Sequence, residues 1–218
     1  MKDLKAIRGN VLLRQMIAEG EHVKQDFKFA ISDARKIARS LSAFANNQGG
    51  RLLIGVKDNG VVAGVRNEED IYVVEQAAER YCNPSQSIDF KAYRIDGKLT
   101  VIVASIDAAD SRPVSVVEAD GSLKAYYRVA DENIAAHPLM VRGWKLAARG
   151  VPEPLSQKHY AVAALFDSPG KMIDVKTIAL SLHLTLEEAE NIVVRLAAAG
   201  LIGFSFDGTR FVPSSNGV

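Results

Sequence analysis

Glu21, Asp26 and Asp58 are the residues whose types and spacing could carry chemistry. Three carboxylates that meet form a set of hard oxygen ligands, which suits Mg²⁺ or Mn²⁺. Such a cation can activate water and stabilise the charge on a phosphate during strand cleavage. Glu21 and Asp26 would face opposite sides of one extended strand unless a bulge or a helix end intervenes. The alternative is that Asp58, which precedes Asn-Gly, only forms a turn and that Glu21 is solvated.

A glycine turn with basic neighbours is the second candidate site. Residues 46–50 read Asn-Asn-Gln-Gly-Gly. Exposed amides of such a turn could hold phosphate oxygens together with Lys28 and Arg51. The alternative is a helix stop at which two backbones pass closely. The chain contains no Gly-x-x-x-x-Gly-Lys-Ser/Thr sequence, so we expect neither a P-loop nor ATPase activity.

Positive charge is concentrated near these residues. The whole chain has a net charge of +1, but residues 1–40 carry nine Lys or Arg against five Asp or Glu, a local net of +4. A polyanion should therefore prefer this half, through phosphate contacts with little base reading. We expect the cations and the three acids to share one open surface. The predicted nucleic-acid contacts are Lys24, Lys28, Arg35, Lys36, Arg39, Asn46, Gly49, Gly50, Arg51 and Arg128.

A strand, a helix and a hairpin must position these side chains. Residues 21–29 read as extended, and Ser32 is expected to cap a helix whose apolar residues recur up to Ala45. The apolar run at 52–56 predicts a buried strand. The turn Asp58-Asn59-Gly60 then predicts that a returning strand begins at residues 61–62.

Several short pieces in this order resemble the AlbA_2 domain of Schlafen proteins and of many bacterial divergent AAA-4 proteins. The resemblance covers about residues 15–135 and implies nucleic-acid binding. In Schlafen ribonucleases a Glu, Glu, Asp trio holds the catalytic metal, and Glu21, Asp26 and Asp58 match it; the usual residue at Asp26 is Glu. Ala130 likewise stands where Gly is common. The matching pieces are Glu21, Asp26-Phe27-Lys28, Ala43-Phe44-Ala45-Asn46, Gly49-Gly50, Leu53-Ile54-Gly55-Val56 with Asp58, and Tyr127-Arg128.

The remaining elements indicate an α+β fold around a mixed sheet. Asp96-Gly97 and Asp120-Gly121 predict hairpins over residues 88–106 and 114–129. Helical spacing predicts helices near 68–82 and 137–149. Two prolines within 150–155 predict a linker. We therefore expect an AlbA_2-like domain at residues 1–149 and a second domain at residues 156–218.

The second domain should contain three helices and a terminal hairpin, which resembles a winged helix-turn-helix. Its third helix carries Glu187, Glu188 and Glu190 near the end that normally enters the major groove. Carboxylates there would meet phosphates and oppose DNA binding. The charge favours protein contact or dimerisation for this helix, and we expect a homodimer.

Composition excludes several classes of protein. One cysteine, Cys82, rules out an internal disulfide. No apolar run reaches membrane-spanning length, and the first residues lack the apolar core of a secretory signal. A cytoplasmic location follows as the expectation. The sequence favours a DNA- or RNA-binding factor, such as a bacterial transcription regulator, with Mg²⁺ or Mn²⁺ as the possible cofactor. The alternatives are a metal-dependent endoribonuclease and a protein-contact module.

Overall fold

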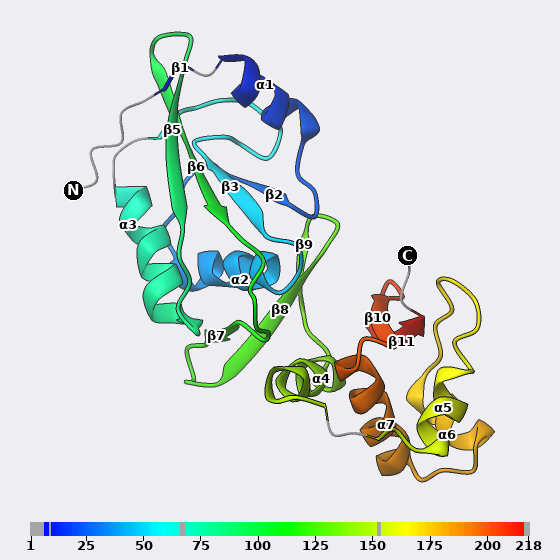
Figure 1. The fold of residues 1–218 in the computed structure, drawn as a ribbon. Helices are drawn as coiled ribbons and strands as arrows, with labels where there is room; N and C mark the ends of the chain where they lie inside the picture. The colour runs from blue at the N-terminus through cyan, green and yellow to red at the C-terminus, as the bar shows by residue number, and fades with distance from the viewer. Residues whose placement is uncertain (1–6, 9, 66–68, 152–153, 216–218) are drawn as a thin grey trace. The chain divides into compact units, whose positions relative to one another are not determined.

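The structure, a computed structural model, describes residues 7–8, 10–65, 69–151 and 154–215. The chain divides into two compact units, the first formed by residues 1–110 with 114–135 and the second by residues 111–113 with 136–218. Helices and strands alternate in the first unit, and helices precede a short hairpin in the second (Figure 1). The predicted α+β fold is confirmed.

A five-stranded mixed sheet forms the frame of the first unit. Its strand order is β1-β5-β6-β3-β2, with parallel pairing at both edges and antiparallel pairing between the inner strands. The predicted hairpin at 88–106 is confirmed as β5 and β6. The strands are β1 (Ile7–Arg8), β2 (Gln25–Lys28), β3 (Gly50–Ile54), β5 (Asp89–Ile95) and β6 (Leu99–Ile106).

A second, antiparallel sheet has the order β4-β7-β8-β9. Helix α2 (Ala34–Ala45) lies between the two sheets and contacts strands of both (Figure 1). It is buried along most of its length, so the main core gathers around Leu41 and Phe44. The strands are β4 (Cys82–Asn83), β7 (Ser115–Val117), β8 (Leu123–Val129) and β9 (Glu132–Ala135).

Two more helical segments complete the first unit. Helix α1 (Asn10–Glu19) packs on the sheet face opposite α2, where Leu13, Phe27 and Leu53 form a smaller core. Helix α3 (Glu69–Gln76) continues directly into a π-helical turn, η1 (Ala77–Tyr81). The predicted helix at 68–82 is thus a helix with a π-helical end, and Glu68 lies outside the described residues.

Two local expectations were wrong. The helix cap is Asp33, whose side chain accepts from the amides of Arg35 and Lys36, and not Ser32. No hairpin follows β3 either. Its partners are β2 and β6. The segment after Asp58 does turn back, through the antiparallel bridge of Val56 with Val62 and backbone bonds to Gly55 and Lys57, but it forms no strand. The turn at residues 58–60 was predicted correctly, but a returning strand cannot pair with β3, because β2 and β6 already occupy both of its edges.

In its described residues, the second unit contains four helices and a two-stranded hairpin, with a core of its own. Helix α4 packs against α7 within this unit, so the segment that we assigned to the end of the first domain contributes Leu139 to the second core. The predicted linker at 150–155 follows α4, and its residues 152–153 lie outside the described residues. The elements are α4 (Pro138–Arg149), α5 (Gln157–Ala163), α6 (Val175–Ser181), α7 (Leu186–Ala198), β10 (Ile202–Phe206) and β11 (Phe211–Ser215).

Within the described part of the chain, no helix combines the length and the apolarity that a bilayer crossing requires.

Candidate functional site

Strand β2 sends alternate side chains to opposite faces of its sheet. Gln25 and Phe27 face α1: the Gln25 amide donates to the carbonyl of Met16, and Phe27 joins the smaller core. Asp26 and Lys28 face α2. The Asp-Phe-Lys sequence therefore places an acid and a base side by side on the same face of an edge strand.

Asp26 is the centre of a buried polar cluster. One carboxylate oxygen, Oδ2, lies 2.8 Å from Lys28 Nζ and accepts from the Ser40 hydroxyl at 3.3 Å. The other, Oδ1, lies 3.6 Å from an Arg128 nitrogen. The side chains of Asp26 and Arg128 are only 5% and 1% exposed, so their contact is shielded from solvent, whereas Lys28 reaches Asp26 from the more exposed side.

Glu21 joins this cluster from the loop before β2. Its Oε1 accepts from the backbone amide of Phe27 at 2.8 Å, and its carboxyl is hydrogen-bonded to Asp26. Burial and the bond to Asp26 raise the pKa of Glu21. Burial alone would raise the pKa of Asp26 too, but the bond from Glu21 and the charge of Lys28 lower it below its ordinary value. When the pair holds one proton, that proton therefore resides on Glu21 and not on Asp26.

Arg128 ties the second sheet to the edge of the first. From β8 it donates to the carbonyl of Gln25 at 3.2 Å and to the Asn133 side chain at 2.9 Å. Its guanidinium lies 5.1 Å from the centroid of the Phe44 ring. We predicted that Arg128 contacts nucleic acid, but its burial excludes a direct contact in this conformation and gives it a structural role.

The predicted three-carboxylate metal site is not assembled. Asp26 pairs in register with Leu52, whereas Asp58 comes six residues further along the chain, in an exposed turn. Across the described residues, no three His, Cys, Asp or Glu side chains lie close enough to hold one metal ion. Glu21 and Asp26 do meet, but Asp26 is already paired with Lys28 and Arg128. The residues present therefore do not fit the metal site that the family resemblance implies.

The glycine turn serves packing. Asn46 is fully buried, and its amide bonds the carbonyls of Val114 and Tyr126. Gly49 is buried with φ +72°, and a Cβ there would lie 2.8 Å from the carbonyl oxygen of Ile106. A Cβ at Gly50 would overlap the Phe44 ring. The structure thus supports the alternative of a helix stop with closely passing backbones, and it gives Asn46 and Gly49 no open surface for a phosphate.

The predicted contacts do not share one surface. Arg51 pairs with Gln25 in register and therefore points to the α1 face, where it bonds Gln25 and forms an ion pair with Glu19. Lys28 lies on the opposite face, beside Asp26. The expectation of a single open surface is therefore corrected, because the alternation of two neighbouring strands separates the groups.

Three of the remaining predicted cations lie on α2, where Lys36 is exposed and Arg35 and Arg39 are half-buried. Arg39 is four positions after Arg35 and three after Lys36, and both spacings make neighbours on a helix surface. The Arg39 guanidinium and Lys124 Nζ each lie 5.7 Å from the centroid of the Tyr126 ring, which places β8 beside this face. We call Arg35, Lys36, Arg39 and Lys124 the α2 basic face. Sequence analysis missed Lys124, although its place two residues before Tyr126 puts both on one side of a strand.

Ion pairs neutralise part of this face. Arg39 forms a two-bond pair with Glu118, at 3.1 and 2.6 Å. Arg35 stacks over Tyr81, with its guanidinium carbon 4.7 Å from the ring centroid. Lys36 is exposed, and among the described residues no ion-pair partner holds its ammonium. Lys24, also exposed, lies in the loop before β2.

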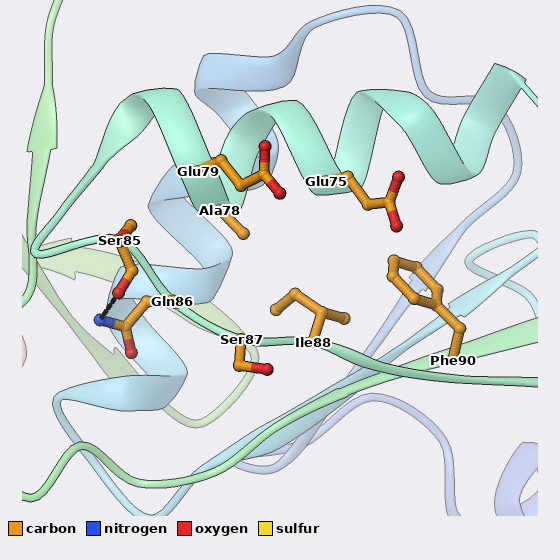
Figure 2. Close-up of a pocket in the computed structure, with 8 residues that line it drawn as sticks. All are labelled: Glu75, Ala78, Glu79, Ser85, Gln86, Ser87, Ile88 and Phe90. Atoms are coloured by element: carbon orange, nitrogen blue, oxygen red, sulfur yellow. Dashed lines mark hydrogen bonds between the residues drawn. The ribbon is translucent and has the colours of Figure 1, made fainter. Parts of the chain in front are cut away.

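A separate hollow of about 400 Å³ lies between the α3–η1 helix and the start of β5. Glu75 and Glu79 project into it from the helix, opposite Ser87 and Ile88 (Figure 2). Two carboxylates and a partly apolar floor give this hollow the wrong charge for a phosphate. It is therefore distinct from the α2 basic face.

Comparison with known proteins assigns the first unit. A family model described as Schlafen, AlbA_2 matches residues 21–137, more than half of the chain. The chain belongs to the Schlafen, AlbA_2 family. The AlbA_2 match begins at Glu21 and includes the Asp26 cluster, α2 and the glycine turn. A comparison with curated proteins found no match.

Two solved structures resemble this AlbA_2 protein. The DIP2311 protein of Corynebacterium diphtheriae is 18% identical with a TM-score of 0.43; the match covers 92% of this chain and 37% of that one. The N-terminal domain of a RecG-related protein from Nitrosomonas europaea is 23% identical with a TM-score of 0.41; here the match covers 56% of this chain and 88% of that one. The present chain thus spans little more than a third of the first of these proteins.

Proposed function

We propose that the AlbA_2 unit binds DNA or RNA through backbone phosphates, with the α2 basic face as its contact surface. Membership of the family supports a nucleic-acid-related function. The observation that carries the proposal is the clustering of three cations from α2 and β8 around two tyrosine rings, with the exposed Lys36 on the same helix.

The charge of this face supports phosphate contact. Four cations stand against two carboxylates, Glu118 and the helix cap Asp33, so a local excess of two positive charges remains. The tyrosine rings hold two of the guanidinium groups in place, which lowers the entropy lost on binding. The aromatic faces themselves are covered by these cations. The arrangement therefore favours phosphate contact over base stacking.

Salt-dependent binding tests the proposal. The double variant Lys36→Gln/Lys124→Gln removes two exposed charges and leaves the Arg39–Glu118 pair intact. Fluorescence anisotropy with a random-sequence duplex should show weaker binding than wild type at low salt. The slope of log K against log salt should fall by about 0.9 for each phosphate that the variant no longer neutralises.

Lys98→Gln is the matched control, because Lys98 is an exposed lysine in the turn between β5 and β6. It should leave the slope unchanged. Equal effects of the control and of the double variant would refute the α2 basic face as the contact surface.

The second unit is proposed to be a winged helix-turn-helix domain that makes protein contacts. Four residues separate α6 from α7, the β10–β11 hairpin follows, and a bridge from Met172 to Ser214 adds a strand-like segment to it. This order supports the assignment. Two of the three acids of α7 are already engaged: Glu188 pairs with Lys158, and Glu190 pairs with Arg142.

Glu187→Gln tests whether this helix contacts DNA. Glu187 is the exposed acid in the first turn of α7, whereas Glu188 also caps the helix through Thr185. Nucleic-acid affinity should stay the same or rise, because a charge that repels phosphate is removed. A marked loss of affinity would mean that the α7 face contacts nucleic acid.

A cytoplasmic regulator that acts as a homodimer is the wider proposal. Tyr160 and Leu180, on α5 and α6, are 60% and 78% exposed, so both side chains are accessible to a partner. Sedimentation of wild type and of a Leu180→Ser variant should show a dimer that weakens in the variant. The endoribonuclease alternative receives no support from the site, because Asp58 is apart from Glu21 and Asp26.

A further inference from the structure

We infer that the Lys28 ammonium is the resident cation of the Glu21–Asp26 carboxyl pair and takes the place that the family resemblance assigns to a divalent metal. The inference concerns this chain's own residues and does not depend on where nucleic acid binds.

The surroundings of the ammonium are those of an oxygen-bound cation. Lys28 Nζ lies 2.8 Å from Asp26 Oδ2 and 2.8 Å from the carbonyl oxygen of Phe27. The Lys28 side chain is 30% exposed, so the ammonium sits at the mouth of the cluster with Asp26 beneath it. A backbone carbonyl and carboxylates are the ligands that hard cations prefer. Here they hold an ammonium group of the same chain.

The charges of the cluster are already balanced. Glu21 and Asp26 supply two acids, and Lys28 and Arg128 supply two bases. When Glu21 holds the shared proton, the cluster carries a net charge of +1. Whether Glu21 is ionised or protonated, the cluster has no net negative charge to attract a dication. The affinity of cation sites depends on the number of charged ligands.

Removal of the ammonium should reverse this balance. Without Lys28, the Asp26 oxygen and the Phe27 carbonyl lose their donor at the exposed side, and Glu21 remains beside them. The Arg128 guanidinium cannot replace the ammonium, because its nitrogens are bonded to Gln25 and Asn133 deeper in the cluster. A small, hydrated cation such as Mn²⁺ could then occupy the vacated position.

Four variants of the full chain test the inference. Each is titrated with Mn²⁺, and electron paramagnetic resonance measures the concentration of free Mn²⁺ during the titration. Lys28→Gln removes the charge, and Lys28→Arg keeps it. Lys28→Gln/Asp26→Asn also removes the main carboxylate. Lys36→Gln removes an exposed lysine that has no role in the cluster.

Only Lys28→Gln should gain saturable Mn²⁺ binding, at least about tenfold tighter than wild type. The same variant should be the one whose thermal unfolding midpoint rises with added Mn²⁺. Wild-type binding as tight as that of Lys28→Gln would overturn the inference, as would an equal gain in Lys36→Gln or no gain in folded Lys28→Gln. If Lys28→Gln does not fold, a fifth variant, Asp26→Asn, is titrated beside wild type. Saturable wild-type binding that Asp26→Asn abolishes would overturn the inference, and the absence of saturable wild-type binding would support it.

Discussion

At the scale of single residues, Asp26 links three parts of the AlbA_2 unit, β2, α2 and β8. Its carboxylate forms ion pairs with Lys28 and Arg128 and accepts a hydrogen bond from the Ser40 hydroxyl. The Arg128 side chain whose charge it neutralises is almost fully buried. Breaking a buried ion pair by removing one partner leaves the other charge uncompensated. The acid that the motif presents as catalytic therefore has a large structural role.

Asp26→Asn is expected to lower the free energy of unfolding by about 3–5 kcal/mol, because Arg128 would keep its charge without a carboxylate. Urea denaturation at pH 7 measures this change. Asp58→Asn is the control, since Asp58 lies in an exposed turn and surface substitutions usually stay within about 0.5 kcal/mol. Similar losses in the two variants would contradict the central position of Asp26.

The two acids should respond to pH in opposite directions. The pKa of Asp26 is lowered in the folded state, so its contribution to stability is present above its ordinary pKa of 3.8 and is lost as the pH falls below that value. The pKa of Glu21 is raised, so its contribution is present below 4.5 and is lost as the pH rises through the folded pKa.

The stability advantage of wild type over Asp26→Asn should therefore shrink below pH 3.8. Glu21→Gln imitates the protonated acid and should gain stability relative to wild type as the pH rises above 4.5. Urea denaturation across pH 3–7 measures both trends. A wild-type advantage over Asp26→Asn that grows below pH 3.8 would show that the direction assigned to Asp26 is wrong.

Sequence reasoning found the right acids at this scale but not their partners. The pairing of Asp26 with Lys28 follows from strand alternation, because residues two apart share a face, and it could have been predicted. The approach of Arg128 could not, because β8 lies about a hundred positions later and reaches β2 only through the packing of α2. At Asp58 the residue type matched the family motif, but the structure places this residue apart from Glu21 and Asp26.

At the scale of elements, α2 and the turn that ends it are fixed by close approach. Gly49 has φ +72°, and a Cβ there would meet the backbone of Ile106 and Ala108 at 2.8 and 2.9 Å. Gly97, in the β5–β6 turn, has the same φ of +72°, but no atom lies within 4 Å of its hypothetical Cβ. Substitutions at Gly97 and Gly49 therefore separate the cost of backbone strain, which both share, from the cost of overpacking, which only Gly49 should show.

Gly97→Ala should therefore lower the free energy of unfolding by about 1 kcal/mol, because alanine is strained in the left-handed conformation. Gly49→Ala should cost a further 1–3 kcal/mol, roughly the penalty for overpacking, because backbone atoms cannot move aside easily. Thermal or urea unfolding of the two variants gives the difference directly. Equal costs would mean that the turn at Gly49 relaxes away from β6.

Local elements were predictable where a short sequence decides them. Both Asp-Gly hairpins formed as expected, since their turn type follows from neighbouring residues. The partners of β3 were not predictable, because parallel pairing with β2 depends on how α2 crosses over the sheet. The π-helical end of α3 likewise has no signal in the apolar spacing.

At the scale of the whole molecule, two separate cores define the units. The core of the second unit consists of residues between Leu139 and Phe204, and its first member lies on α4. Helix α4 ends at Arg149, before the predicted linker, as expected, but it packs against α7, which follows the linker in the sequence. A helix that precedes a linker in the sequence can still pack with helices that follow the linker, and composition alone does not show this.

A fragment of residues 136–218 is expected to fold and to unfold cooperatively. A fragment that begins at residue 150 lacks α4, so Leu139 and Leu146 would be missing from the core beside α7. Removing two large apolar side chains from a core costs several kcal/mol, and a domain of this size has little stability in reserve. Circular dichroism during heating should show a clear transition only for the longer fragment. An equally stable short fragment would restore the boundary at 150–155.

The acidic and basic groups around β2 have one more consequence. β2 is the last strand of its sheet, and the backbone groups of Gln25 and Phe27 point away from β3. The Phe27 amide is bonded by Glu21, its carbonyl by Lys28, and the Gln25 carbonyl by Arg128. A foreign strand that approached this border would find no free donor or acceptor on these two residues. Residues that read as a cutting motif thus also guard the protein against edge-to-edge aggregation.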